Sequence, residues 1–312
     1  MTVSTTSSAA WARAVEAEER GDTDDAIAAY MEAAEGGDLD AASNLGRLLR
    51  VLGRSREAER WLTPAAERGH AAAQFNLGAL HQVAGDAEAA ERWYRKAAKG
   101  GFAKAAANLA FMLLEHDEDE DAERFARQAV EAGETSALGT LGSALMGQGK
   151  NEEAVSYFEQ DAELGDERAA FNLGALAEGR GEDAEARRWY EKAQAAGHAA
   201  AAFNLGTACD RAGDEDGALR WYLRGSELGD LSAAYNAGLL AWEREDADAA
   251  KLHLRRAADG GHDGAATSLG FVLMELGDLD RAEERLGPIA QAGDEDARAH
   301  LTELQRRRRH QS

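Results

Sequence analysis

The chain has 312 residues and a formal net charge of −23, with 58 acidic and 35 basic side chains. This balance is the opposite of what a general nucleic-acid binder needs, so we expect no nucleic-acid partner. The single cysteine, Cys209, excludes an internal disulfide framework, and only two prolines interrupt a composition that favours helix.

The N-terminal segment, residues 1–10, is rich in Ser and Thr and has neither a basic region nor an apolar run of the kind found in secretory signals. We predict that it is disordered. No stretch of the chain approaches 18 uncharged apolar residues, so we expect no membrane insertion and a cytoplasmic location.

A 32-residue repeat dominates the rest of the chain. It is clearest in the tripeptide Asn-Leu-Gly, which starts at Asn44, Asn76, Asn172 and Asn204 and has degenerate copies between them. One alanine recurs in the same register without exception, at Ala26, Ala58, Ala90, Ala122, Ala154, Ala186, Ala218, Ala250 and Ala282. A fixed period of this length is typical of helical solenoids, in which each repeat packs only on its neighbours.

Each repeat is predicted to be helix A, a tight turn, helix B and a glycine stop. One set of glycines (Gly37, Gly69, Gly101, Gly133, Gly165, Gly197, Gly229, Gly261 and Gly293) ends every helix B. A second set (Gly53, Gly85, Gly149, Gly181, Gly213 and Gly277, with Gly21 in the first hairpin) marks the turn between helix A and helix B. The small Ala and Gly positions let helices approach closely, and a column of Leu and aromatic residues supplies the apolar contact.

In chain order, residues 11–38 form a degenerate hairpin that caps the N-terminal end, and residues 39–294 form eight complete repeats. Residues 295–305 are expected to be a last helix that covers the other end. Residues 306–312 are expected to be a basic, disordered tail that begins with four arginines, which could pair with acids of the same chain. The predicted fold is all-α, a right-handed α-solenoid of about nineteen helices.

The repeat resembles the tetratricopeptide repeat in its small-Leu-Gly motif, its alanine column and its aromatic column. The phrases Ala-Phe-Asn-Leu-Gly at 170–174 and 202–206, Trp-Tyr-x-Lys-Ala at 93–97 and 189–193, and Gly-His-Ala-Ala at 69–72 and 197–200 are similar to the SEL-one-like subfamily. The chain lacks the extra turn residues usual in that subfamily. The resemblance implies a right-handed superhelix that acts as an adaptor or scaffold, with helix A on the concave surface.

Helix A carries little net charge. The eight predicted windows hold seven basic and eight acidic residues, so almost all of the acidity lies on helix B, the turns and the caps. If helix A lines the groove, the groove is nearly neutral, and a column of asparagines follows it (Asn44, Asn76, Asn108, Asn172, Asn204 and Asn236). An asparagine amide can both donate to and accept from the backbone of an extended peptide. The same amides could equally bond the backbone of the neighbouring repeat.

An aromatic column runs beside the asparagines, at Phe75, Phe171, Phe203 and Tyr235, with Phe111, Phe271 and Trp242 further along helix A. These rings could receive apolar side chains of a peptide. They could also pack between helices, which is the usual role of large apolar residues at helical spacing.

Other candidate sites lack the required residues. His70, His198 and His262 have no second ligand at metal-binding spacing, and the acidic run 117–121 lacks the glycine and terminal glutamate of a calcium loop. No catalytic triad or carboxylate pair can be assembled. We therefore expect no enzyme activity, no metal and no cofactor.

The sequence favours a protein-interaction scaffold whose concave groove holds a protein or peptide partner. Two alternatives remain open: a structural protein that self-associates, and a regulatory subunit of an enzyme complex. The oligomeric state and the identity of the partner are not fixed by the sequence.

Overall fold

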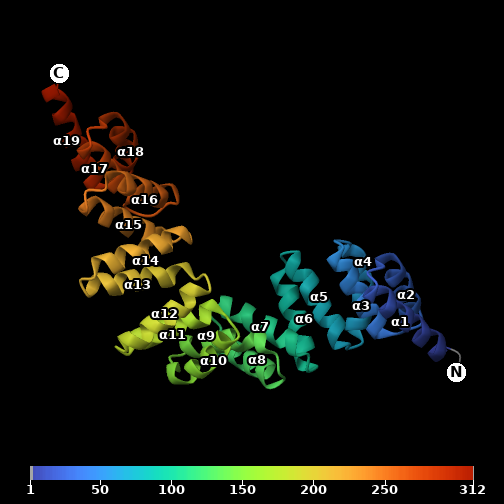
Figure 1. The fold of residues 1–312 in the computed structure, drawn as a ribbon. Helices are drawn as coiled ribbons and strands as arrows, with labels where there is room; N and C mark the ends of the chain where they lie inside the picture. Colours follow the sequence, from blue (N-terminus) through green and yellow to red (C-terminus); the bar gives the residue numbers. More distant parts are fainter. Residues whose placement is uncertain (1–2, 312) are drawn as a thin grey trace. The chain divides into compact units, whose positions relative to one another are not determined.

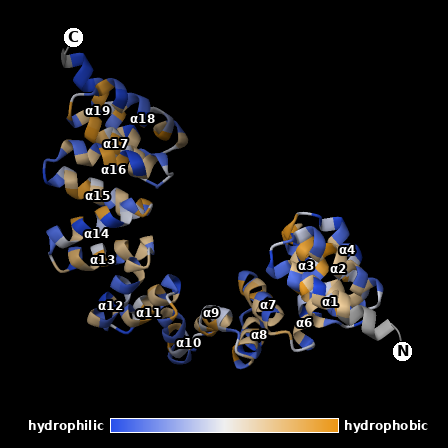
Figure 2. Ribbon diagram, turned by 45° about the vertical axis from the view of Figure 1, so that its right-hand side comes forward, coloured by the Kyte–Doolittle hydropathy of each residue, from blue (hydrophilic) through white to orange (hydrophobic). Residues whose placement is uncertain are grey.

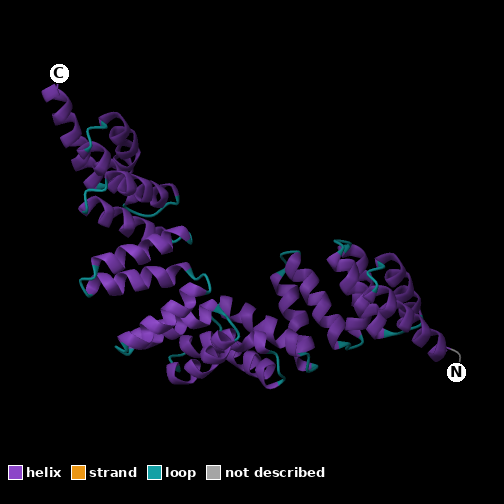
Figure 3. Cartoon of the chain, viewed as in Figure 1, coloured by secondary structure: helices purple, strands orange, loops and turns teal. Residues whose placement is uncertain are grey.

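The computed structural model describes residues 3–311, and these residues form nineteen α-helices and one short 3-10 helix (Figures 1 and 3). No strand occurs among them. This confirms the predicted all-α solenoid and its number of helices.

Helices of odd and even number alternate as helix A and helix B of successive repeats. The helix A elements are α3 (Leu39–Val51), α5 (Ala71–Val83), α7 (Ala103–Glu115), α9 (Leu138–Gly147), α11 (Glu167–Gly179), α13 (Ala199–Arg211), α15 (Leu231–Glu243) and α17 (Ala265–Glu275). The helix B elements are α4 (Ser55–Glu67), α6 (Ala87–Lys99), α8 (Asp119–Glu131), α10 (Asn151–Glu163), α12 (Asp183–Ala195), α14 (Glu215–Glu227), α16 (Ala247–Asp259) and α18 (Leu279–Ala292). The 3-10 helix η1 (Thr135–Ala137) precedes α9.

The helices form two compact units, residues up to 157 and residues from 158, with the division inside α10. Within each unit, each helix packs on the next along the chain, and the apolar residues form bands along the helices rather than one central core (Figure 2). This arrangement is expected when each repeat buries its apolar face against its neighbours.

The N-terminal prediction needs a correction. Helix α1 (Val3–Glu19) already begins at Val3, so residues 3–10 are helical rather than disordered; residues 1 and 2 lie outside the described part of the chain. Helix α1 contains no Gly or Pro. Its later turns bury Ala10, Ala14 and Ala17 and pair with α2 (Thr23–Glu35), which anchors the helix.

The C-terminal helix is also longer than predicted. Helix α19 runs from Glu295 to Gln311 and includes the four arginines that were expected in a disordered tail. Arg307 pairs with Glu275 at 2.7 Å, and Arg308 pairs with Glu283 at 2.7 Å and with Asp280. These acids belong to α17 and α18, so the basic segment is bound to the last repeat.

The turns between helix A and helix B require a positive φ. Six glycines predicted at these turns adopt φ between +74° and +81°: Gly53, Gly85, Gly149, Gly181, Gly213 and Gly277. Two turns lack the glycine and have Asp117 (φ 59°) and Glu245 (φ 61°) in the same register. A side chain in this left-handed region is strained, so the backbone geometry of the turn is set by the repeat rather than by the local residue.

The glycine of each Leu-Gly pair marks the closest approach of helix A to its own helix B. A Cβ added at Gly206 would lie 2.5 Å from the Tyr222 ring, and the same holds at Gly174 against Tyr190. Gly238 and Gly270 face Leu254 and Leu286 in the same way. The large side chain on helix B therefore occupies the space that the glycine leaves. Both it and the residue before the glycine, which is leucine or, at Gly238, Ala237, are buried.

Successive helix A elements also contact one another within each unit, as α3 does α5, α13 does α15 and α17 does α19. No comparably close pairing of successive helix B elements occurs in the described residues. The helix A layer is therefore the inner, more closely spaced side of each unit.

The close approach predicts opposite effects for two Gly→Ala substitutions. Gly206→Ala should lower the melting temperature by roughly 2–8 °C, because overpacking of about 1–3 kcal/mol exceeds the gain in helix propensity. Gly179→Ala in α11, where nothing lies within 4 Å of an added Cβ, should leave the melting temperature unchanged or raise it. Circular dichroism melts of both variants test this, and equal melting temperatures would contradict it.

The strained turns predict a stabilising substitution. Glu245→Gly should raise the melting temperature by a few degrees, because glycine removes a cost of about 1–2 kcal/mol at this φ. Glu243→Gly, at the last residue of α15, should not raise it, because the backbone there is helical and the glycine only weakens the end of the helix. Thermal melts of the two variants side by side provide the measurement, and a destabilised Glu245→Gly protein would disprove the argument.

Candidate partner-binding surface

The asparagine column lies on the inner layer, where the structure divides it into two groups. Asn76 is buried and donates hydrogen bonds to the carbonyl oxygen and the hydroxyl of Ser43, at 3.3 and 3.1 Å. Asn108 donates to the hydroxyl of Tyr94 at 3.2 Å, and Asn204 hydrogen-bonds Tyr190. These three amides act within the scaffold.

The other three asparagines, Asn44, Asn172 and Asn236, are half-buried. Within the described residues their side chains have no hydrogen-bond partner, although each carries one acceptor and two donors. These amides are therefore partly accessible and not used by the fold. They form the part of the predicted column that remains available for a partner.

The aromatic column packs against other rings. Phe75 lies 5.7 Å from Tyr94 and 5.0 Å from Phe102, measured between ring centroids. The pattern repeats at the other three positions, where Phe171 stacks on His198, Phe203 lies near Tyr222 and Tyr235 stacks on His262. All four rings are half-buried, so they join helix A to helix B and to the following linker while keeping one side accessible.

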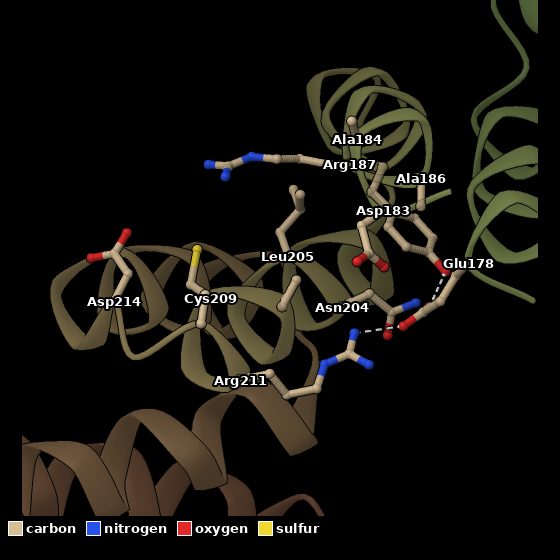
Figure 4. Close-up of a pocket in the computed structure, with 13 residues that line it drawn as sticks. Glu178, Asp183, Ala184, Ala186, Arg187, Asn204, Leu205, Cys209, Arg211 and Asp214 are labelled. Carbon is tan, nitrogen blue, oxygen red and sulfur yellow. Dashed lines mark hydrogen bonds and ion pairs between the residues drawn. The ribbon is translucent and has the colours of Figure 1, made fainter. Parts of the chain in front are cut away.

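A cleft opens between α12 and α13, with one wall from the end of α11 (Figure 4). Its volume is 560 Å³. Its floor includes Leu205, Ala208 and Cys209, and its rim includes Glu178, Asp183, Arg187, Arg211 and Asp214.

Small residues at two adjacent positions create this cleft. The other repeats have at least one large side chain at the register of Ala208 and Cys209, such as Leu48–Leu49, Met112–Leu113 and Val272–Leu273. Cys209 is buried. The sequence shows this departure from the repeat, but we did not predict the cleft from it.

The polar groups of the α12–α13 cleft are largely engaged with one another. Glu178 accepts hydrogen bonds from the Tyr190 hydroxyl at 2.9 Å and from Arg211 at 2.7 Å (Figure 4). Burial, together with the hydrogen bond to Glu178, raises the pKa of Tyr190, so its hydroxyl stays protonated. Asp214 caps α14 through the backbone N–H of Gly217. The cleft therefore holds an ion-paired rim above an apolar floor.

A second hollow, which we call the C-terminal hollow, has a volume of 350 Å³. Its walls come only from helix A elements and their linkers. It is lined by Tyr235, Leu239 and Trp242 of α15, by Gly264, Thr267, Ser268, Phe271 and Val272 at α17, and by Asp294, Asp296 and His300 at α19.

The late start of α17 opens this hollow. In the other complete repeats helix A starts two residues after the glycine that ends helix B, or, in the fourth repeat, one turn of 3-10 helix occupies that place. Here Asp263 and Gly264 intervene, with Gly264 at φ 79°, so α17 begins only at Ala265. The missing first turn would otherwise lie against α15.

The tryptophans of the two Trp-Tyr-x-Lys-Ala phrases pack on lysines of their own helices. Trp93 and Trp189 are half-buried on helix B, with Lys96 over the first ring at 4.0 Å and Lys192 over the second at 5.1 Å. Among the described residues no cluster of three or more His, Cys, Asp or Glu side chains could hold a metal ion. Nor is any helix there both long and apolar enough to cross a membrane.

Comparisons with known proteins agree with this architecture. Residues 140–198 match one tetratricopeptide repeat model, and residues 39–62, 71–96, 199–224 and 264–288 match a second, together about half of the chain. No curated protein matches the sequence.

Solved structures of repeat proteins are similar over most of the chain. A protective antigen of uropathogenic Escherichia coli with an SLR fold, c5321, is 25% identical, with a TM-score of 0.69 over 90% of this chain and 67% of that one. A Sel1 repeat protein from Oxalobacter formigenes is 25% identical, with a TM-score of 0.64 over 86% of this chain and 87% of that one. PilF of Pseudomonas aeruginosa, 22% identical, with a TM-score of 0.52 over 66% of this chain and 96% of that one, shares the fold.

The matched repeats, the alternating helix A and helix B elements and the buried Leu-Gly contacts lead to one assignment. The chain belongs to the tetratricopeptide and SEL-one-like family of helical repeat proteins.

Proposed function

We propose that this protein is a non-catalytic scaffold that holds an extended segment of a protein partner along its helix A layer. Proteins with this fold generally act as protein-interaction scaffolds. The observation that carries the finer proposal is that Asn44, Asn172 and Asn236 keep half-buried amides without side-chain hydrogen bonds on the inner layer. A scaffold that used these amides only for packing would bond them as it bonds Asn76.

The spacing of the helices suits an extended segment. Packed helices lie about 8–10 Å apart, and an extended chain advances about 3.3 Å per residue. Positions in adjacent repeats would therefore meet about every third residue of the partner, and Asn172 and Asn236, which are two repeats apart, about every sixth. An amide at each position can donate to a carbonyl oxygen and accept from an N–H of the partner backbone. Because the asparagine amides carry no charge, these backbone hydrogen bonds themselves should depend little on salt.

Site-specific photocrosslinking tests the location of the partner. A photoreactive amino acid placed at Asn172 or Asn236, on the inner layer, should crosslink the partner in the native host. The same group at Arg188, an exposed residue of helix B in α12, should not. Mass spectrometry then identifies the crosslinked protein. Partner crosslinks from position 188 and none from positions 172 and 236 would overturn the proposal.

Crosslinks between copies of the chain would instead support self-association. The exposed apolar residues Val51, Leu52 and Val83, at the ends of α3 and α5, are the feature that favours this second candidate. Light scattering of the purified protein over a concentration series distinguishes the two functions, because only self-association increases the mass without a partner.

The two groups of asparagines predict different consequences of truncation. Asn172→Ala combined with Asn236→Ala should leave the melting temperature within about 1–2 °C and weaken the crosslinked partner's affinity roughly 5- to 150-fold, since two hydrogen bonds contribute about 1–3 kcal/mol. Asn76→Ala, the matched control, should lower the melting temperature by roughly 2–8 °C, because Ser43 loses its partner in a buried site.

Affinity per folded molecule should be unchanged in the Asn76→Ala protein. If the double variant melts early and binds normally, Asn172 and Asn236 belong to the scaffold as Asn76 does.

A further inference from the structure

The C-terminal hollow has features that the repeat fold does not require. Three aromatic residues from two helices, Tyr235 and Trp242 of α15 and Phe271 of α17, face one cavity. The Trp242 and Phe271 rings meet edge-on at 6.1 Å, and Phe271 lies 5.2 Å from the His300 ring. All four side chains are half-buried rather than buried, so their rings are accessible from the inner layer.

Helical spacing explains why these side chains share one cavity. Tyr235, Leu239 and Trp242 follow one another at i, i+4 and i+7 on α15, and Thr267 and Phe271 are four residues apart on α17. Residues at these intervals lie on one face of a helix. His262 stacks on one face of the Tyr235 ring at 4.6 Å, which fixes the ring at the wall of the hollow.

Acidic groups lie at the edge of this aromatic cavity. Asp294 accepts the cap hydrogen bond of α19 from the N–H of Ala297 through one oxygen, at 2.7 Å, and its other oxygen takes no part in that bond. Asp296 is exposed one turn before His300 on the same helix. The hollow therefore combines ring faces with two carboxylates.

A buried hydroxyl without a partner gives a second, independent indication of a ligand. Thr267 lines the hollow, is only 9% exposed, and has an Oγ1 atom with no hydrogen-bond partner. The Nδ1 atom of His262, beside Tyr235, is also buried without a partner. Buried polar atoms normally find partners, so unpaired ones beside a cavity indicate where an additional donor or acceptor would be accommodated.

We propose that the C-terminal hollow is a docking site for an arginine side chain of a protein partner. The guanidinium group would stack on one of the two aromatic rings, Trp242 or Phe271, which meet edge-on, and donate hydrogen bonds to the carboxylates of Asp294 and Asp296. This inference rests on the proposed function, since it specifies one side chain of the segment that the helix A layer would hold.

Arginine fits these features better than other side chains. Its planar group stacks on aromatic faces and presents a fork of N–H donors that matches carboxylates, whereas the ammonium group of lysine is a compact, strongly hydrated charge. An apolar side chain would leave the carboxylates and the Thr267 hydroxyl without a donor. The volume of 350 Å³ is at the lower end of ligand cavities, about 300–1,000 Å³, which suits one side chain.

Three arginines of the neighbouring helix α19 are already engaged. Arg306 pairs with Glu303, Arg307 with Glu275, and Arg308 with Glu283. No arginine of the described residues lines the hollow, so the proposal takes the docking arginine from another protein.

The test uses a library of random 12-residue peptides displayed on phage and selected on the full-length protein. Selected peptides should share an arginine. Replacing that arginine by citrulline, which keeps the shape and removes the charge, should weaken binding of the synthetic peptide at least about tenfold. Binding should also weaken when the salt concentration rises, since the carboxylates are partly exposed.

Variants of the protein locate the binding site. Asp294→Asn combined with Asp296→Asn should weaken the affinity for the peptide about tenfold or more. Asparagine can also cap a helix, so the fold should be preserved. Glu295→Gln is the matched control, because Glu295 is an exposed acid in the same turn that does not line the hollow. Its affinity should equal that of the unmodified protein.

Several outcomes would overturn the inference. These are a selection without shared arginine, a citrulline peptide that binds as tightly, and an Asp294→Asn, Asp296→Asn protein with unchanged affinity. The crosslinking experiment at Asn172 and Asn236 does not depend on these peptides. Partner crosslinks at these positions combined with arginine-independent peptides would therefore reject the arginine site alone. Arginine-dependent peptides combined with no partner crosslinks at these positions would reject only the proposed binding along the asparagines of the helix A layer.

Discussion

The contact between the glycine of helix A and the large side chain of helix B determines the geometry of most repeats, and in the third repeat Ala110 and Ala126 take these positions. At Gly206 the Tyr222 ring occupies the space that any Cβ would need, and Leu254 does the same at Gly238. This contact fixes how close the two helices of a hairpin approach and leaves the preceding leucine free to fill the space toward the next repeat. Since each repeat buries its surface only against its neighbours, the same contact recurs along both units.

Regular packing explains what the sequence predicted well. The 32-residue register, the turn glycines and the alanine column are local signals, and helix boundaries follow from them. The two ends were predicted incorrectly because their structure depends on partners distant in sequence. Arg307 and Arg308 are ordered by acids in α17 and α18, and the first turns of α1 continue a helix whose later part packs on α2. Composition alone does not show such partners.

The site was harder to predict for the same reason. All six asparagines share one register, yet only Asn76 is opposed by a serine, Ser43, that can accept its hydrogen bonds from the preceding helix A. The residue in that place is Phe75 for Asn108 and Phe203 for Asn236. Asn108 nevertheless belongs to the scaffold, because it donates to the hydroxyl of Tyr94, whereas Asn236 has no such bond among the described residues. Whether an asparagine belongs to the scaffold therefore depends on the acceptor that the fold places beside it, which the shared register does not show. The two hollows arise where the repeat is broken, at Ala208–Cys209 and at Asp263–Gly264, and a search for regularity passes over such positions.

Charge adds a reason for the inner layer to prefer a basic partner. Helix A is nearly neutral, so most of the net charge of −23 lies on helix B, the turns and the caps. Such a surface attracts cationic segments from a distance and raises their association rate, while salt weakens the attraction. Attraction alone gives no register, because it acts on any basic chain. To fix the register of a bound segment, one cationic group must bind at one defined position. Among the described cavities the C-terminal hollow provides such a position, because its carboxylates lie next to aromatic faces on rigid helices. If one arginine of a partner segment is held there, the residues next to that arginine would lie along α15 and near Asn236. The unpaired amide of Asn236 could then bind the backbone of the segment.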